Sequence, residues 1–153
     1  MKHSCTMIDI VREGAIVVAE LDVDRARRQM LTLKGEFPPR RTVRLMVDTG
    51  AELSFVDQAV AMDLGLRQLR SAEIVGVSQR PEVHPVFAAT LFLGINTPTP
   101  GIVQIPIEVA AMRENITALP FNGLLGRVFL RDFELEYSGR DHAFALSSNR
   151  PSW

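Results

Sequence analysis

The chain has 153 residues, of which 46% are hydrophobic and 23% charged, and this balance is typical of a globular protein and excludes a disordered one. Its 17 basic and 18 acidic side chains give a formal net charge of −1, and no segment gathers lysine and arginine into a stripe that could follow a nucleic acid backbone. We therefore expect no nucleic acid partner. The length fits a single domain over residues 1–153, with a core over about 15–147.

Two further kinds of site are disfavoured by the composition. Cys5 is the only cysteine, so no internal disulfide can form, and the Cys, His and carboxylate residues are not spaced like metal ligands. No apolar run approaches the length that spans a bilayer, and charged residues interrupt the N-terminal segment. We expect a soluble, cytoplasmic protein with no cofactor, no metal and no membrane insertion.

Short apolar segments rich in Val, Ile, Leu and Phe are separated by Gly, Pro or Asn, which predicts a mainly β protein. Prolines remove backbone donors from a sheet, so the segments 33–40 and 95–101 are predicted to be loops. The expected strands are, in chain order, Ala15–Val23, Thr42–Val47, Glu73–Val77, Val86–Leu93, Ile102–Ala111, Phe133–Tyr137 and Ala143–Leu146.

One helix is predicted from its end signals. Asp57 is suited to be the N-cap of a helix over Gln58–Leu64, and Gly65 is suited to the left-handed residue that ends it. A second, shorter helix is expected to begin near Arg127. The basic run Arg25–Arg28 is interpreted as solvated surface.

The first chemical motif is Asp48-Thr49-Gly50-Ala51, directly after the strand that ends at Val47. A carboxylate at the end of a rigid strand is held in place, Gly50 allows a tight turn beside it, and the Thr49 hydroxyl can bond inside that turn. By itself the tripeptide Asp-Thr-Gly is also typical of a strand that ends in an Asx turn.

The second motif, Gly123-Leu124-Leu125-Gly126-Arg127, begins 75 residues after Asp48. The two motifs in this order resemble the retropepsin family of aspartic proteases. The resemblance implies a compact, closed β barrel with one or two short helices, in which Leu124 and Leu125 pass beneath the Asp48 loop and support it.

The resemblance also implies an ion pair between the acidic residue after the first motif, Glu52, and the arginine of the second, Arg127. A carboxylate and a guanidinium can form a geometrically specific, two-bond contact. We therefore expect Glu52 and Arg127 to support the Asp48 loop together.

A third element that the resemblance implies is a hairpin, the flap, which closes over a bound peptide. The segment Glu73–Val83 lies in the right interval and places Gly76, Val77 and Ser78 near its tip. Viral flap tips are richer in glycine than this one, so an ordinary surface hairpin is the alternative interpretation.

Hydrolysis of a peptide bond by carboxylates needs one group to take a proton from water and another to give one to the carbonyl oxygen. Two carboxylates held close together share one proton and supply both roles. Since the chain has a single Asp-Thr-Gly motif, the second Asp48 has to come from another copy in a two-fold homodimer. The resemblance implies that Thr49 of each chain braces the pair.

The predicted function is therefore an aspartic endopeptidase whose partners are a peptide or protein substrate and a second copy of the chain. The alternative is a binding or assembly module that keeps the retropepsin fold without cleaving anything. A third interpretation, a chaperone-like or secretion-related β domain, treats both motifs as coincidence. His3, His84 and His142 stand in no serine- or cysteine-protease motif, and we treat them as structural or solvent-exposed.

Overall fold

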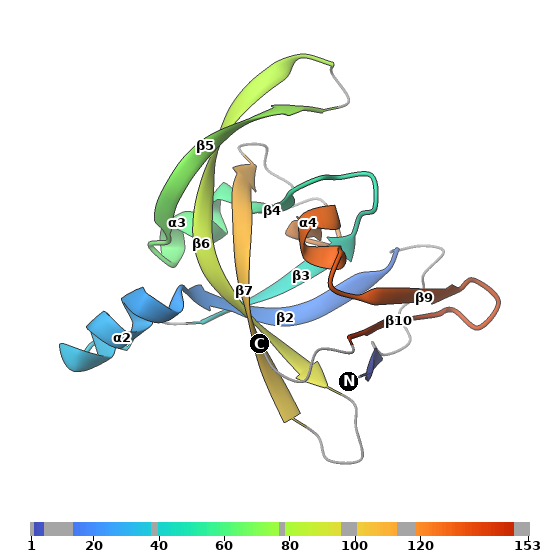
Figure 1. The fold of residues 1–153 in the computed structure, drawn as a ribbon, viewed down its shortest axis with the longest axis horizontal. Helices are drawn as coiled ribbons and strands as arrows, with labels where there is room; N and C mark the ends of the chain where they lie inside the picture. The colour runs from blue at the N-terminus through green and yellow to red at the C-terminus, as the bar shows by residue number, and fades with distance from the viewer. Residues whose placement is uncertain are drawn as a thin grey trace.

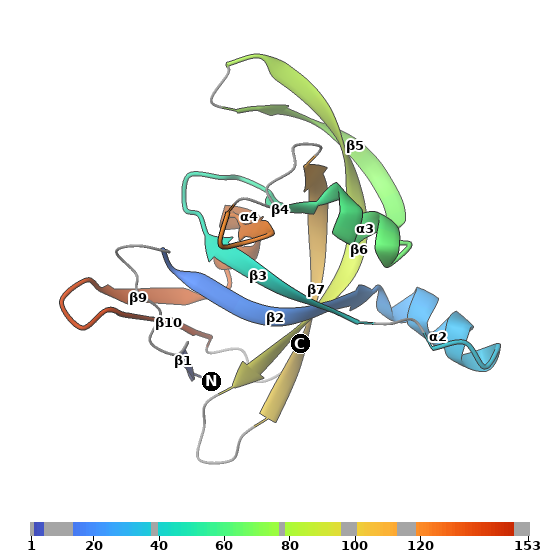
Figure 2. The same ribbon diagram turned by 180° about the vertical axis from the view of Figure 1, so that it is seen from behind.

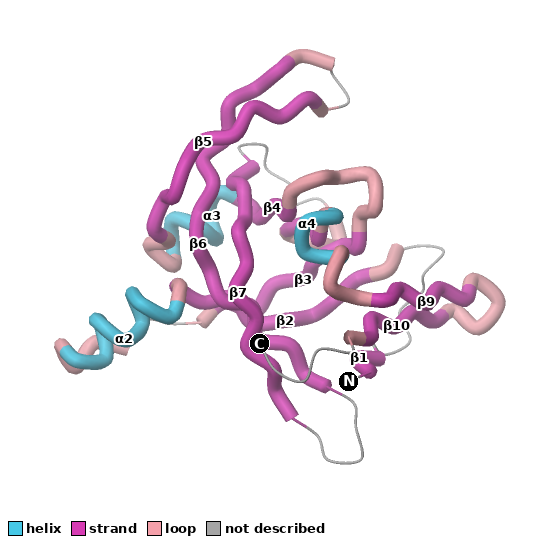
Figure 3. The backbone as a smooth tube through the Cα atoms, viewed as in Figure 1, coloured by secondary structure: helices cyan, strands magenta, loops and turns pink. Residues whose placement is uncertain are grey.

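The computed structural model describes residues 2–4, 14–37, 40–76, 79–95, 101–112 and 119–148. Strands dominate these residues, and the helices are short (Figure 3). The strands are β1 (Lys2–Ser4), β2 (Ile16–Val23), β3 (Arg41–Val47), β4 (Ser54–Asp57), β5 (Arg67–Val75), β6 (Pro81–Ile95), β7 (Gly101–Met112), β8 (Gly123–Leu125), β9 (Glu134–Ser138) and β10 (Ala143–Ser147). The helices are α2 (Arg25–Leu33), α3 (Gln58–Asp63) and α4 (Arg127–Leu130).

A closed barrel forms the centre of the described structure (Figure 1). Strands pair in the order β2-β3-β8-β4-β7-β6-β5, and β2 also pairs with β6, which closes all of them except β5 into a ring. The core contains fully buried Val17 and Leu21 of β2, Leu45 of β3, Leu91 of β6 and Leu125 of β8. The mainly β class and the closed barrel predicted from the sequence are confirmed.

The order of the strands in the sheet departs from their order in the chain at two places: β4 lies next to β7 and not next to β5, and β8 is inserted earlier in the order. β3 and β4 are joined by residues 48–53, yet β8 lies between them, parallel to β3 and antiparallel to β4. The segment from the far end of the chain therefore passes between the two strands that flank the Asp48 loop. This insertion is what positions the candidate site.

A smaller sheet, β1-β10-β9, lies beside the barrel (Figure 2). β10 pairs with β1 and β9 in antiparallel register. Its buried residues Phe144 and Leu146 belong to the main core, so the sheet is packed against the barrel by apolar contacts and does not stand apart from it.

The expected strands at Ala15–Val23, Thr42–Val47, Ile102–Ala111, Phe133–Tyr137 and Ala143–Leu146 are all observed within one or two residues of their predicted bounds. β5 begins at Arg67, six residues earlier than the expected Glu73, and β6 extends beyond both ends of Val86–Leu93. The short strands β1, β4 and β8 were not predicted, since three or four residues give too little periodicity to be recognised.

Helix α3 begins at Gln58, as predicted, and its N-cap is Asp57, whose side chain accepts a hydrogen bond from the Ala59 N–H. Gly65 adopts a left-handed φ of 59° just beyond it. Helix α4 begins at Arg127, also as predicted. Of the predicted loops, residues 38–39 and 96–100 lie outside the described part of the chain.

Helix α2 was not predicted, but Arg25, Ala26 and Arg27 are exposed, as the interpretation of this run as solvated surface requires, and Arg28 is partly buried. Asp24 caps the helix by accepting from the Arg27 N–H at 3.1 Å, and Gly35 follows its end with a φ of 74°. None of the α2 residues is buried. The helix projects away from the barrel (Figure 1).

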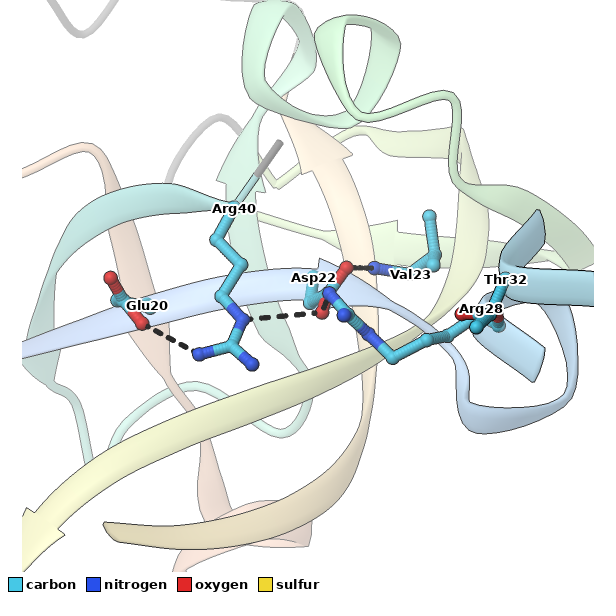
Figure 4. A network of polar contacts seen from close by, with 6 residues as sticks. All are labelled: Glu20, Asp22, Val23, Arg28, Thr32 and Arg40. Carbon is cyan, nitrogen blue, oxygen red and sulfur yellow. Dashed lines mark hydrogen bonds and ion pairs between the residues drawn. The ribbon is translucent and has the colours of Figure 1, made fainter. Parts of the chain in front are cut away.

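A buried carboxylate ties α2 to the barrel. The side chain of Asp22, in β2, has no exposed surface; its Oδ1 accepts from the Val23 N–H at 2.7 Å, and its Oδ2 pairs with Arg28 and lies 3.6 Å from Nε of Arg40 (Figure 4). The Arg40 guanidinium also lies 3.9 Å from the centroid of the Phe92 ring. Burial and the positive charge of Arg40 lower the pKa of Arg28. A buried charge is tolerated only with such partners, so these contacts tie Arg28 of α2 and Arg40, just before β3, to Asp22 of β2.

Of the helices in the described part of the chain, none combines the length and the apolar character needed to cross a membrane.

Candidate active site

The Asp48 loop, residues 48–53, begins where β3 ends. Oδ1 of Asp48 accepts a hydrogen bond from the Gly50 N–H at 2.9 Å and a longer one from the Ala51 N–H at 3.3 Å. The Ala51 N–H also lies 3.3 Å from the Asp48 carbonyl oxygen. This is the Asx-type turn that was the alternative interpretation of the tripeptide, and it fixes one oxygen of the half-buried carboxylate.

The strand β8 supports the loop from its inner side. The Asp48 N–H donates to the Leu125 carbonyl oxygen at 3.0 Å, and Val47 stands opposite Leu125 in the register of β3 and β8. The Leu125 side chain is fully buried in the main core, and Leu124 is partly buried against a second apolar cluster that contains Phe55. The two leucines thus face opposite sides of the strand, as the alternation of a strand requires.

The two glycines that frame β8 are required by close packing. A Cβ on Gly123 would overlap the Phe55 carbonyl oxygen of β4, and a Cβ on Gly126 would lie 2.8 Å from the Glu52 carbonyl oxygen and closer still to that of Leu53. Both contacts are with backbone, which cannot give way as a flexible side chain can. The spacing of the second motif therefore follows from how tightly β8 passes the Asp48 loop and β4.

Arg127 holds the loop in a way that the sequence did not predict. Its Nη1 donates to the carbonyl oxygens of Thr49 at 3.0 Å and Gly50 at 2.9 Å. Within the described part of the chain, no ion pair joins it to Glu52, whose side chain is exposed. The expected Glu52–Arg127 ion pair is thus replaced by bonds to the backbone, because the turn directs two carbonyl oxygens at the guanidinium.

Glu52 and its neighbour Ala51 contact the second motif through their backbone. The Arg127 N–H donates to the Ala51 carbonyl oxygen at 2.9 Å, and the Val128 N–H donates to the Glu52 carbonyl oxygen at 3.0 Å. The first N–H groups of α4 are unpaired within a helix, and the Asp48 loop supplies their acceptors. The loop and the start of α4 therefore form one hydrogen-bonded unit.

Two supporting residues were missed by the sequence analysis. Ser54, 2% exposed, accepts a hydrogen bond from the Gly126 N–H at 3.1 Å. Asn122 bonds to β3 through both its N–H and its side chain, which accepts from the Arg44 N–H at 2.7 Å, and its carbonyl oxygen accepts from the Asp57 N–H. The available signal was a polar residue three positions after the first motif and one directly before the second, since buried polar side chains commonly form hydrogen bonds with main-chain groups.

Thr49 and Gly50 form the exposed tip of the loop. The Thr49 carbonyl oxygen is used by Arg127, while its hydroxyl makes no hydrogen bond to any of the described residues. The turn is therefore closed by the Asp48 carboxylate, and the predicted bond of the Thr49 hydroxyl inside the turn is not formed.

The hairpin of β5 and β6 occupies the interval predicted for the flap, and its tip lies at the same end of the molecule as the Asp48 loop (Figure 1). Gly76 follows β5 and accepts from the Gln79 N–H at 3.0 Å, which closes the turn. Val77 and Ser78 lie outside the described residues. β6 ends and β7 begins at the opposite end of the barrel (Figure 1), so the segment 95–101, predicted as a loop, starts and ends away from the Asp48 loop.

Comparison with known protein families gives a match to the model described as aspartyl protease, over residues 30–129. The match covers about two-thirds of the chain and contains both motifs. The chain belongs to the aspartyl protease family. The predicted family is thereby confirmed, and the closed barrel agrees with the fold that the resemblance to retropepsins implied.

The structure of this aspartyl protease family member is also similar to a retropepsin-like aspartic protease from Rickettsia conorii, at 17% sequence identity and a TM-score of 0.42, with 69% of this chain and 73% of that chain covered. A likeness of that size adds no weight to the assignment. A comparison with curated protein sequences finds no significant match.

Within the described residues, no group of three or more His, Cys, Asp or Glu side chains could hold a metal ion. The chemistry that the site can offer from those residues is that of a carboxylate, Asp48, held by main-chain N–H groups.

Proposed function

We propose that this protein is an aspartic endopeptidase in which two Asp48 residues, one from each chain of a homodimer, activate a water molecule for attack on a peptide bond. The observation that carries the proposal is the fixed carboxylate of Asp48 in a chain of the aspartyl protease family. Its Oδ1 accepts main-chain hydrogen bonds, and the loop is anchored to β8 and α4.

The chemistry follows from the pairing of like charges. Two carboxylates held close together cannot both ionise easily, so one carries the proton that the other lacks. The ionised group takes a proton from water while the protonated group gives one to the carbonyl oxygen of the scissile bond. The chain has one Asp-Thr-Gly motif, so the second carboxylate is supplied by a second copy.

The exposure of the loop tip supports this arrangement. Thr49 and Gly50 are exposed, and Asp48 is half-buried, so the Asp48 loop of a second chain can approach this loop without any change in the fold of either chain. In that dimer Thr49 would brace the opposite loop, and the hairpin around Gly76 would cover the peptide as a flap.

The test is digestion of a peptide library by the wild-type protein and by Asp48→Asn. Asparagine keeps the size and the acceptor oxygen of the side chain but cannot act as a base, so we expect the fold to persist and cleavage to fall by about 10³-fold or more. Circular dichroism and sedimentation check the fold and the dimer of the variant. Cleavage by Asp48→Asn at the wild-type rate contradicts the mechanism, and a folded, dimeric wild type that cleaves no peptide favours the alternative, a binding or assembly module.

A further inference from the structure

The hairpin of β5 and β6 leaves the barrel at a defined point. β6 pairs with β7 from Ile95 to Val86 and with β5 from Ala88 to Pro81. Residues 81–85 of β6 and 71–75 of β5 therefore form a two-stranded arm, with no third strand from the described part of the chain beside it. Such a ribbon is only marginally ordered by itself, so its orientation depends on contacts at its base.

The ladder with β7 stops at a proline, and β7 itself ends at Met112, one residue beyond Ala111. The register pairs Val86 with Ala110, and its continuation places Pro85 opposite Ala111. Proline has no N–H and cannot donate to the ladder. The neighbouring residue supplies the donor: Nδ1 of His84 lies 3.0 Å from the Ala111 carbonyl oxygen. Because a carbonyl oxygen only accepts, Nδ1 carries the hydrogen.

The rest of the imidazole is packed against the strand that follows the Asp48 loop. The His84 ring meets the Phe55 ring edge-on, with centroids 6.1 Å apart and an angle of 87°. Phe55 is in β4 and is 8% exposed. Ala72 and Ile74 of the arm pack in the same apolar cluster as Phe55. His84 thus connects the base of the arm to β7 by a hydrogen bond and to β4 by a ring contact.

The outer nitrogen of the ring faces the arm itself. Nε2 of His84 lies 3.7 Å from Oε2 of Glu82, two residues earlier on β6. The His84 side chain is 13% exposed and that of Glu82 is 65% exposed. Because both residues belong to the arm, this contact does not hold the arm to the barrel, and the bond from Nδ1 does.

We propose that His84 is a positioning residue that sets the angle of the arm to the barrel, with its imidazole N–H replacing the main-chain N–H that Pro85 lacks. The side-chain bond continues the contact with β7 for one further position, at which Pro85 has no N–H to donate. The arm is then anchored at its base and free at its tip. An effect of His84 on peptide binding rests on the proposed function. An effect of His84 on the mobility of the arm does not depend on that function.

The experiment measures amide hydrogen exchange in the full chain for three variants. His84→Leu removes the donor and keeps an apolar side chain against Phe55. His84→Asn keeps a donor, because its amide nitrogen occupies nearly the place of Nδ1. His84→Leu with Pro85→Ala restores a main-chain N–H opposite Ala111 and lets the backbone make the missing bond.

We expect His84→Leu to speed the exchange of arm amides, residues 71–76 and 82–84, by roughly three- to tenfold, the loss of one net hydrogen bond. The amides of β2 and β3 should be unchanged, His84→Asn should stay near the wild type, and Pro85→Ala in the His84→Leu background should restore protection of the arm. Equal acceleration in arm and barrel, or no rescue by Pro85→Ala, overturns the proposal.

The same variants distinguish a failure of this proposal from a failure of the proposed function. If the wild type cleaves no peptide, the proposed function fails, and the exchange pattern still decides the role of His84. If the wild type is active, His84→Leu should raise KM several-fold more than it lowers kcat, since a loosened arm weakens binding without touching Asp48. A fall in kcat with KM unchanged contradicts a positioning role in peptide binding.

Discussion

Main-chain groups from both motifs converge on Asp48. Its N–H reaches Leu125, its carboxylate accepts from Gly50 and Ala51, and Arg127 bonds to the carbonyl oxygens at the tip of the turn. Holding a functional group by backbone contacts needs fewer ordered side chains than holding it by long ones. Such contacts require the backbone of β8 to approach that of the Asp48 loop and β4 closely, and Gly123 and Gly126 permit this approach.

The first prediction concerns Gly126. A Cβ there meets the backbone of residues 52 and 53, so Gly126→Ala should destabilise the protein by about 1–3 kcal/mol and shift the Asp48 loop. Urea unfolding measures the stability. Gly94→Ala is the control, because a Cβ at that exposed position meets nothing within 4 Å; equal stability of the two variants contradicts the packing argument.

The second prediction concerns Arg127 and Glu52. Arg127→Met removes the bonds to the Thr49 and Gly50 carbonyl oxygens and should cost about 1 kcal/mol, because the guanidinium is exposed. Glu52→Gln should be close to neutral. In a double-mutant cycle by urea unfolding, the effects of the two substitutions on the free energy of unfolding should add within about 0.5 kcal/mol. Strong coupling would show that Glu52 and Arg127 interact as the ion pair that the sequence suggested.

At the scale of elements, Gly76 in the arm differs from Gly123 and Gly126 beside the Asp48 loop, because no atoms crowd it. Gly76 has a φ outside the left-handed region, and an added Cβ would meet nothing within 4 Å. The folded chain by itself therefore gives no steric reason for glycine at this position. Under the proposed function the reason is the close approach of a bound peptide to the backbone of the arm.

The third prediction follows from that contrast. Gly76→Val should leave the urea midpoint almost unchanged and lower kcat/KM by about tenfold, because the added side chain obstructs the peptide. Gly94→Val is the matched control, since it lies on β6 at the other end of the barrel and is equally open. Hydrogen exchange of the arm should slow when an inhibitor binds. An unchanged kcat/KM in Gly76→Val, or arm amides that an inhibitor leaves unchanged, would show that this hairpin is not the flap.

At the scale of the whole molecule, the last prediction concerns the dimer. One chain supplies one Asp-Thr-Gly motif, so specific activity should fall on dilution below the dimer dissociation constant and follow the dimer fraction measured by sedimentation. Mixing wild-type and Asp48→Asn chains in equal amounts should inactivate the mixed dimers as well. A monomer with undiminished specific activity contradicts the proposal.

The sequence by itself determined the features that depend on neighbouring residues. The turn at Asp48-Thr49-Gly50, the caps of α3 at Asp57 and Gly65 and the long strands β2 and β7 are set by local hydrogen bonds and apolar periodicity. The paired motifs were also enough to identify the family.

The tertiary structure alone decided how distant segments meet. The insertion of β8 between β3 and β4, the backbone partners of Arg127, the roles of Ser54 and Asn122 and the bond from His84 to Ala111 all join residues far apart in the chain. A local pattern shows that a polar group needs a partner, but which group meets it depends on strand order and register. Both are fixed only by the pairing of strands in the folded chain: β8 pairs with β3 and β4 beneath the Asp48 loop, and β7 pairs with β6 beside the base of the arm.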